Sequence, residues 1–333
     1  MKQKKLFSYL LLAISFTLFT ACTNEDEVQE VSFSAPEYED ISAKYEITDS
    51  SSNINSLELT ASGNYIVTNN YYIYNSKAYR NTENNKEFSF LNKTVLKING
   101  LSTRASAYGN IIYGKFTALG ENRYDLEGYG IVTITTDSEN AYTLDIALEN
   151  GNTVSIGARK EKTYESSNAT NNLCRSWSIE KFGFKVQAGP YKFEKLVDDN
   201  NIEQLFLDYF NWIIKISGEE YDEEEIAEMK AEAKNIAETY NSAKPLSLIF
   251  TKSGSYMVDY NNGAIGISTW KWEDESKGIL RYSWNTQDIE DEYIGGTVNI
   301  SYLDNMLMIS ENVENDVEEG LNVTITYGMK EIK

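Results

Sequence analysis

The sequence contains one strand–turn–strand pattern twice, and this repeat limits the folds that the chain can adopt. Residues 59–67 (LTASGNYIV) correspond to residues 250–258 (FTKSGSYMV), with Thr, Ser, Gly, Tyr and Val at the same places. The Ser-Gly pair supplies a residue that tolerates positive φ at a turn, and alternating apolar and polar residues on each side are typical of strands with one buried face. Each copy is therefore predicted to be a β-hairpin.

The similarity extends to the start and the end of each copy. Residues 44–47 (KYEI) precede the first hairpin as residues 176–179 (SWSI) precede the second, and each segment supplies an aromatic residue near the start of a strand. Residues 153–160 (TVSIGARK) resemble residues 322–330 (NVTITYGMK) as closing strands. The same order of three markers predicts two units of one kind, and the alternative is chance similarity between β-rich stretches.

Further strand signals lie between these markers. Within residues 142–148, Tyr142, Leu144, Ile146 and Leu148 share one face, which is the period of two expected for a half-buried antiparallel strand. The other candidates are residues 95–98, 111–118, 124–127 and 131–135 in the first unit and residues 267–272, 279–284, 297–302 and 306–310 in the second. Short strands at this spacing predict a mainly β protein with a small antiparallel barrel or sandwich in each unit.

The second unit also carries an insertion, residues 196–244, that is predicted to form a helical hairpin. Its first half places apolar residues at helical spacing: Ile202, Leu205, Phe206, Tyr209, Phe210, Ile213 and Ile214. The second helix is predicted to begin near Asp222, because Asp222 and Glu225 have the spacing of a capping box. This hairpin would either form a lid across the barrel or enlarge its core, and the core interpretation is favoured.

These patterns divide the chain into five parts. Residues 1–21 are a predicted signal peptide, and residues 22–40 are a flexible tether with few large apolar residues. The first β domain covers residues 41–162, and a Ser/Asn-rich linker covers residues 163–173. The second β domain then covers residues 174–333 and contains the helical insertion.

The leader has the order of residues that is typical of secretion. Lysines at positions 2, 4 and 5 precede an apolar run from Leu6 to Phe19, and Cys22 follows shortly after it. This run is shorter than the about 20 apolar residues that a membrane-spanning helix needs. Cleavage before Cys22 is therefore predicted.

The segment from Leu18 to Cys22 resembles the lipobox of bacterial lipoproteins, in which a small residue precedes a cysteine that receives lipid. This resemblance implies that Cys22 carries diacylglycerol and anchors the chain to a membrane; the alternative is a plain signal peptide with an unused cysteine. The acidic stretch from Glu25 to Glu27 resembles the export tag of surface lipoproteins in glycan-foraging Gram-negative anaerobes. It implies an outer-membrane protein that faces the cell exterior, whereas the simpler interpretation is a solvated tether.

Composition argues against several functions. With 51 acidic and 30 basic residues the net charge is −21, so nucleic acid and anionic lipid would be repelled. The chain has no histidine, which removes Ser-His and Cys-His catalysis and the commonest metal ligand. Once Cys22 is lipidated, Cys174 is the only thiol, so it has no partner for a disulfide, and we expect it to be buried.

Nothing in the sequence predicts a catalytic, cofactor or metal site. The acidic cluster in residues 219–225 lacks the ligand and glycine spacing of a calcium loop, and negative charge suits the start of a helix. No phosphate-binding loop, dinucleotide fingerprint or nucleophile elbow occurs. We therefore expect a protein that is not an enzyme and holds no cofactor, with a two-carboxylate hydrolase as the remaining catalytic alternative.

The two units resemble the lipocalin-like domains of bacterial surface lipoproteins, which have an opening strand with an aromatic residue, a Ser-Gly hairpin and an aromatic-rich meander. The resemblance implies two up-and-down barrels and a ligand at a barrel mouth, although fold does not establish function. The densest aromatic group, Trp270, Trp272, Tyr282 and Trp284, places two rings on one side of each of two strands. These rings would either stack on a ligand or fill the barrel core.

The sequence thus supports two functional hypotheses. The leading one is a non-catalytic module that binds a glycan or a small apolar molecule, and it predicts a pocket that exposes Trp270, Trp272 or Trp284. The alternative is a structural component that docks onto an outer-membrane protein, and it predicts a filled barrel with an apolar patch outside.

Overall fold

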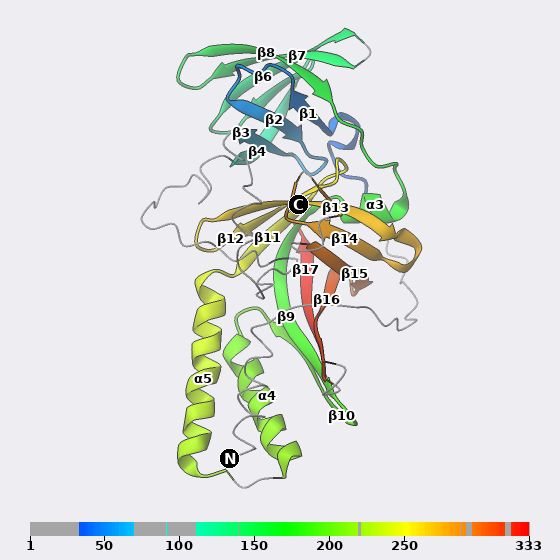
Figure 1. Cartoon of the computed structure of the whole chain (residues 1–333). Coiled ribbons are helices and arrows are strands. Elements are labelled where there is room, and N and C mark those ends of the chain that lie inside the picture. Colours follow the sequence, from blue (N-terminus) through cyan, green and yellow to red (C-terminus); the bar gives the residue numbers. More distant parts are fainter. Residues whose placement is uncertain are drawn as a thin grey trace.

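The computed structural model describes residues 33–69, 91, 111–138, 140–218, 221–286, 288–290, 295–316 and 321–332, with the backbone alone at 313–316. Two antiparallel β-barrels follow one another along the chain, and a helical hairpin extends from the second barrel on the side away from the first (Figure 1). The predicted fold class, with two small barrels and a helical insertion in the second, is confirmed. No described helix has the length and apolar character needed to cross a membrane.

The first barrel is closed and has eight strands in sequence order, because β8 pairs back onto β1. A short 3-10 helix, η1 (Glu39–Ile41), precedes it. Its strands are β1 (Ala43–Ile47), β2 (Ile54–Leu59), β3 (Asn64–Asn69), β4 (Ile111–Gly120), β5 (Arg123–Leu126), β6 (Gly130–Ser138), β7 (Ala141–Leu148) and β8 (Thr153–Lys160). The predicted strand at residues 95–98 lies outside the described residues.

The second barrel repeats this order and is closed by pairing of β17 with β9. Helix α3 (Asn168–Leu173) precedes it, and η2 (Glu275–Lys277) lies between two of its strands. Its strands are β9 (Ser176–Ala188), β11 (Pro245–Phe250), β12 (Ser255–Tyr260), β13 (Ile265–Asp274), β14 (Ile279–Ser283), β15 (Gly295–Leu303), β16 (Met306–Asp316) and β17 (Leu321–Glu331). A ninth strand, β10 (Tyr191–Asp198), forms a hairpin with β9 and is an edge strand in the described sheet.

The insertion forms helices α4 (Ile202–Ser217) and α5 (Glu223–Ser242). The predicted capping box is confirmed: the Asp222 carboxylate accepts a hydrogen bond from the backbone amide of Glu225 at 2.9 Å, and the Glu225 carboxylate accepts one from the amide of Asp222 at 3.2 Å. Two of the four free amides at the start of α5 are satisfied in this way.

Strand registers show that the sequence repeat marks equivalent positions in the two barrels. Leu59 pairs with Tyr65 between β2 and β3, as Phe250 pairs with Tyr256 between β11 and β12. The two Ser-Gly turns also receive equivalent backbone hydrogen bonds, from Phe116 to Gly63 at 3.0 Å and from Trp270 to Gly254 at 2.8 Å. Both glycines have positive φ, 77° and 81°, which explains why glycine occupies the turn in each copy.

The hydrophobic cores follow from the alternation within these strands. The first barrel is filled by inward-facing residues such as Leu57, Val67, Leu126 and Leu144. The second core is larger because it also takes in apolar residues from α4 and α5. In particular, Phe206 and Tyr209 of α4 contact Phe184 of β9 at ring-centroid distances of 5.4 and 5.2 Å. The helical hairpin therefore forms part of the core.

Candidate functional site

Of the four aromatic residues that the sequence singled out, three lie on the neighbouring strands β13 and β14 of the second barrel, and Trp284 directly follows β14. Trp270 of β13 pairs directly with Tyr282 of β14, and Trp272 pairs with Leu280. Trp270, Tyr282 and Trp284 are buried, with 1%, 1% and 0% of their surface exposed, while Trp272 is half-buried. The predicted juxtaposition is present, and three of the four side chains lie inside the barrel.

Trp270 packs against other aromatic rings and is hydrogen-bonded at its polar edge. Its ring lies 5.7 Å from that of Phe250 and 4.9 Å from that of Tyr164. Its indole nitrogen donates to the carbonyl oxygens of Thr251 and Ser255, each at 3.1 Å. The packing and hydrogen bonding of this indole are thus those of a core residue.

Polar groups also lie within this interior. The Tyr282 hydroxyl donates to the Glu311 carboxylate at 2.5 Å, and Tyr256 forms a hydrogen bond with Ser268. Burial raises the pKa of Tyr282 and of Tyr256 well above the usual value, so both hydroxyls remain protonated at neutral pH. The cluster can donate and accept hydrogen bonds, but its described members do not include a proton-transfer group exposed to solvent.

The end of the second barrel that is nearer the first barrel is covered by segments from outside the sheet. Phe33 packs edge-on against Trp177 at 5.6 Å, and the guanidinium of Arg175 lies 5.0 Å from the Phe33 ring. Tyr164 hydrogen-bonds through its hydroxyl to the carbonyl of Trp270 at 2.8 Å. Residues before β1 and in the linker therefore cap this end.

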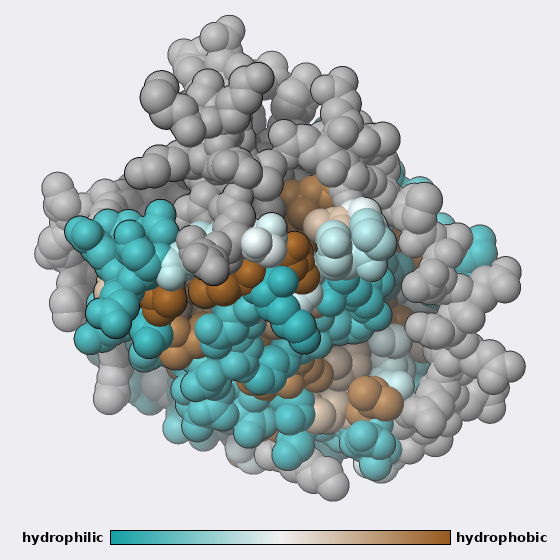
Figure 2. Space-filling model, turned by 90° about the horizontal axis from the view of Figure 1, so that it is seen from below, coloured by the Kyte–Doolittle hydropathy of each residue, from teal (hydrophilic) through white to brown (hydrophobic). Residues whose placement is uncertain are grey.

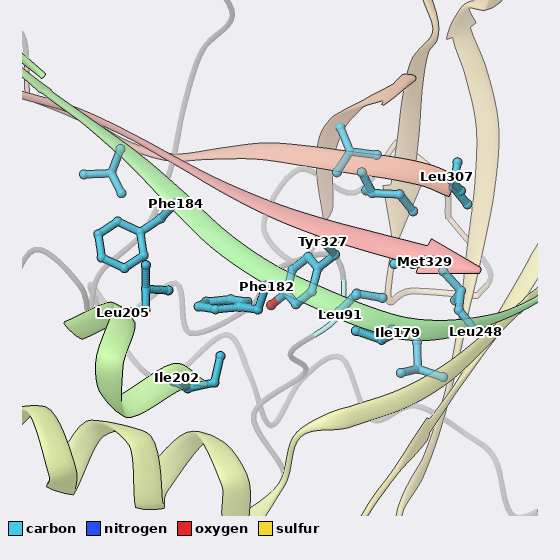
Figure 3. Packing of buried hydrophobic residues seen from close by; sticks show 14 of the residues in the cluster. Leu91, Ile179, Phe182, Phe184, Ile202, Leu205, Leu248, Leu307, Tyr327 and Met329 are labelled. Atoms are coloured by element: carbon cyan, nitrogen blue, oxygen red, sulfur yellow. The ribbon is translucent and has the colours of Figure 1, made fainter. Parts of the chain in front are cut away.

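The opposite end is covered by the helical hairpin and by Leu91 (Figure 3). Tyr240 of α5 lies 4.9 Å from Phe182, whose ring also lies 5.3 Å from Tyr327. Leu91, which is fully buried, accepts a hydrogen bond at its carbonyl from the Tyr260 hydroxyl at 2.7 Å. Both ends of the second barrel are thus occupied by the chain itself.

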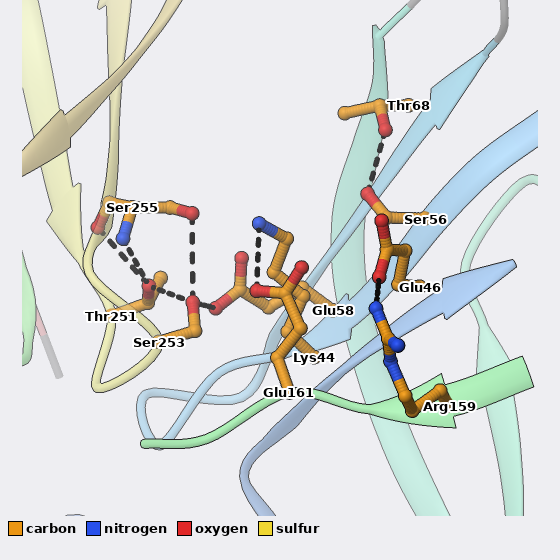
Figure 4. A network of polar contacts seen from close by, with 10 residues as sticks. All are labelled: Lys44, Glu46, Ser56, Glu58, Thr68, Arg159, Glu161, Thr251, Ser253 and Ser255. Carbon is orange, nitrogen blue, oxygen red and sulfur yellow. Dashed lines mark hydrogen bonds and ion pairs between the residues drawn. The ribbon is translucent and has the colours of Figure 1, made fainter. Parts of the chain in front are cut away.

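A second candidate site lies at the junction of the two barrels (Figure 4). Here a small hollow is lined by residues from both barrels, among them Glu58, Thr251, Lys252 and Ser253. The Glu58 carboxylate accepts a hydrogen bond from the Ser253 hydroxyl at 2.5 Å. Burial raises the pKa of Glu58, and nearby Lys44 partly opposes this increase.

The lysine on the other side of this hollow is also buried and paired. The Lys252 ammonium binds the Glu39 carboxylate at 2.6 Å and the Ser166 hydroxyl at 3.0 Å. Glu58 and Lys252 were not predicted from the sequence. A signal was available for Glu58, because the repeat aligns this charged residue with Ile249 on an otherwise equivalent strand.

Neither the described acidic residues nor the buried cysteine forms a metal or thiol site. Within the described ranges no cluster of His, Cys, Asp and Glu side chains could hold a metal ion. Of the acidic cluster, Glu219 and Glu220 lie outside the described residues, while Asp222 and Glu225 form the helix cap. Cys174 is buried, which raises the pKa of its thiol, and Cys22 lies outside the described residues.

No protein-family model matches the sequence, and no curated protein matches it. Among solved structures, the chain is similar to transferrin-binding protein B of Haemophilus parasuis, described as a vaccine antigen, at 8% sequence identity and a TM-score of 0.19. The match covers 67% of this chain and 39% of that protein. A protein of unknown function in the DUF3598 family, from Nostoc punctiforme, matches at 7% identity and a TM-score of 0.20, with 87% of this chain and 94% of that one covered. TM-scores this low support no inference about function.

Proposed function

We propose that this chain is a lipid-anchored protein, displayed on the outer surface of a Gram-negative cell, that binds an outer-membrane protein with the outside of its two-barrel body and performs no catalysis. The observation that carries the proposal is the filled second barrel. Trp270, Tyr282 and Trp284 are buried in the core, and of the four predicted rings Trp272 alone is partly exposed. Of the two hypotheses from the sequence, this packing favours docking.

Contacts near the start of the described chain support a short connection between anchor and body. Arg175, itself buried, donates to the carbonyl of Ser34 at 2.7 Å and binds Glu331 at 2.6 Å. Phe33 packs against Trp177, and Glu39 forms an ion pair with Lys252. A lipid on Cys22 would then be separated from the folded body by about ten residues, which span at most about 35 Å when extended.

The edge strand β10 is the surface that best suits a protein partner. It pairs on one side only within the described sheet, so its other edge presents backbone donors and acceptors. Tyr191 and Leu196 on this strand are among the most exposed large apolar residues, at 49% and 37%. On the described surface seen from the side toward which α4, α5 and β10 project, hydrophilic residues predominate and hydrophobic ones lie between them (Figure 2). Strand addition to such an edge is a common mode of protein recognition.

Site-specific photo-crosslinking in cells tests the docking proposal. A photoreactive amino acid at Tyr191 should give a discrete adduct with a membrane protein, whereas the same group at Leu119, which is equally exposed on the first barrel, should give none. Equal labelling at both positions, or none at either, would count against docking through β10.

Cys22→Ser should move the protein out of the membrane fraction, and protease treatment of intact cells should digest the wild type.

A second candidate function, the binding of a small molecule inside the second barrel, is favoured by one observation. The interior contains the Tyr282–Glu311 and Tyr256–Ser268 hydrogen bonds, which provide donors and acceptors in an apolar setting. Titration of the soluble chain, from Thr23 onward, with glycans and small apolar molecules tests it through tryptophan fluorescence. A saturable change that is lost in Trp284→Phe would favour this function over docking, and a flat response would favour docking.

A further inference from the structure

Equivalent strands of the two barrels face each other where the barrels meet. An apolar layer between them is built from the outward-facing residues of β3 and β4 in the first barrel and of β11, β12 and β13 in the second. Ile66 and Met257 lie in this layer, buried to 2% and 1% exposure. They are the same position of the repeat, because Ile66 pairs with Glu58 of β2 and Met257 pairs with Ile249 of β11.

The next strands contribute equivalent residues as well. Tyr113 and Ile267 are the partners of Ile66 and Met257 in β4 and β13. Ile111 and Ile265 occupy the positions two residues before them, and all four contribute to the same layer. An interface to which both sides contribute the same set of positions is characteristic of two-fold symmetry between identical subunits.

Polar contacts at the rim also join the turn of each barrel to the other barrel. In the first barrel's turn, Ser62 accepts a hydrogen bond from Ser176 of β9 at 2.8 Å, and Asn64 donates to Ser176 at 2.9 Å. In the second barrel's turn, Ser253 donates to Glu58 of β2 at 2.5 Å. Ser62 and Ser253 are equivalent residues of the repeat. The turn of each barrel thus contacts the opening strands of the other.

We infer that the junction is a fused two-fold dimer interface: each barrel presents a face that recognises a second barrel of the same fold, and the two halves bind one another without a covalent link. The layer has the composition of a permanent interface, because its buried members are Ile and Met. Glu58 places a charged residue where the second barrel has Ile249, and its carboxylate accepts a hydrogen bond from Ser253. The partner that this face fits is therefore the other half of this chain.

Cleavage of the folded chain tests the inference. A protease site inserted between Lys162 and Thr163, which are both exposed, allows the soluble chain to be folded intact and then cut between the barrels. Light scattering should show that the two halves remain a 1:1 complex during dilution to about 1 μM, which corresponds to a dissociation constant in the micromolar range or below. Two folded halves that separate at tens of micromolar or above would overturn the inference.

Substitutions at the equivalent positions identify which contacts hold the halves together. Ile66→Asp and Met257→Asp should each weaken association by about 100-fold or more, because each places an unpaired carboxylate in the apolar layer. Leu246→Asp, at an exposed position on β11, should leave association unchanged. Phe33→Ala removes a contact with Trp177 and should weaken association less than Ile66→Asp does. Loss of association in Phe33→Ala but not in Ile66→Asp would show that the segment before β1 holds the halves, and it would refute the inference.

The uncut chain provides a measurement that does not depend on the cut halves staying soluble. In small-angle scattering, the double variant Ile66→Asp/Met257→Asp should have a larger radius of gyration than the wild type, while circular dichroism retains the β-sheet signal. An unchanged radius in a folded double variant would contradict the inferred interface.

Discussion

Replacing Gly266 with alanine tests whether the second barrel is filled. An added Cβ would lie 2.9 Å from Cζ3 and 3.2 Å from Cη2 of Trp284, well inside ordinary van der Waals contact. The indole has little freedom to yield, because Trp284 is fully buried and its ring packs 5.6 Å from that of Tyr256. Overpacking of this kind costs about 1–3 kcal/mol, so the free energy of unfolding should fall by that amount.

Urea unfolding, followed by tryptophan fluorescence and near-UV circular dichroism, measures this loss as a lower midpoint with an unchanged slope. Gly157→Ala is the matched control on β8, where the new Cβ would meet only the Thr48 hydroxyl, at 3.2 Å. The control should change stability by less than about 0.5 kcal/mol. If Gly266→Ala is as stable as the wild type, the Trp284 ring has room to move and the interior is not filled.

Three other substitutions test the junction, the helix cap and the cap of the second barrel. Burial raises the pKa of Glu58 in the folded protein above its usual 4.5. The folded state therefore favours the protonated carboxyl, and this contribution to the free energy of unfolding is complete below pH 4.5 and is lost as the pH rises through the folded-state pKa. Glu58→Gln should therefore gain stability over the wild type with rising pH, by up to about 1.4 kcal/mol per unit; a constant difference in urea unfolding between pH 5 and 8 would contradict this. Asp222→Ala should cost about 1 kcal/mol and speed hydrogen exchange in the first turn of α5, and unchanged exchange there would argue against the capping box. Phe33→Ala should lower the free energy of unfolding by about 1–3 kcal/mol through lost contact with Trp177 and Arg175, and an unchanged thermal midpoint would show that this cap is dispensable.

Local patterns in the sequence predict much of the fold because strands and turns are determined by nearby residues. The Ser-Gly turns depend on a positive φ, and the alternation around Leu144 and around Trp270 depends on a period of two. The Asp222 cap depends on a spacing of three residues. The hairpin of β9 with β10 was not predicted, because β10 runs from Tyr191 into the segment that the sequence assigned to the insertion.

The remaining features depend on contacts between distant parts of the chain. Glu58 contacts the opposite barrel through Ser253, and Lys252 contacts the segment before β1 through Glu39. The local sequence around them carries no sign of a junction, except that Glu58 stands where the second barrel has Ile249. Residues 33–40 contain few apolar side chains and were therefore assigned to the tether, yet Phe33 and Tyr38 pack against the two barrels. Composition alone cannot show that a segment with few apolar residues packs against both barrels.

Acrylamide quenching of tryptophan fluorescence tests the filled second barrel most directly. Trp212 and Trp272 are half-buried, so Trp212→Phe/Trp272→Phe leaves Trp177, Trp270 and Trp284, which are all within 1% of full burial. A filled, capped barrel predicts blue-shifted emission and a quenching slope several-fold lower than that of the same variant unfolded in urea. A slope close to the unfolded value would show that the quencher reaches the interior, and it would contradict the basis for assigning binding to the outer surface.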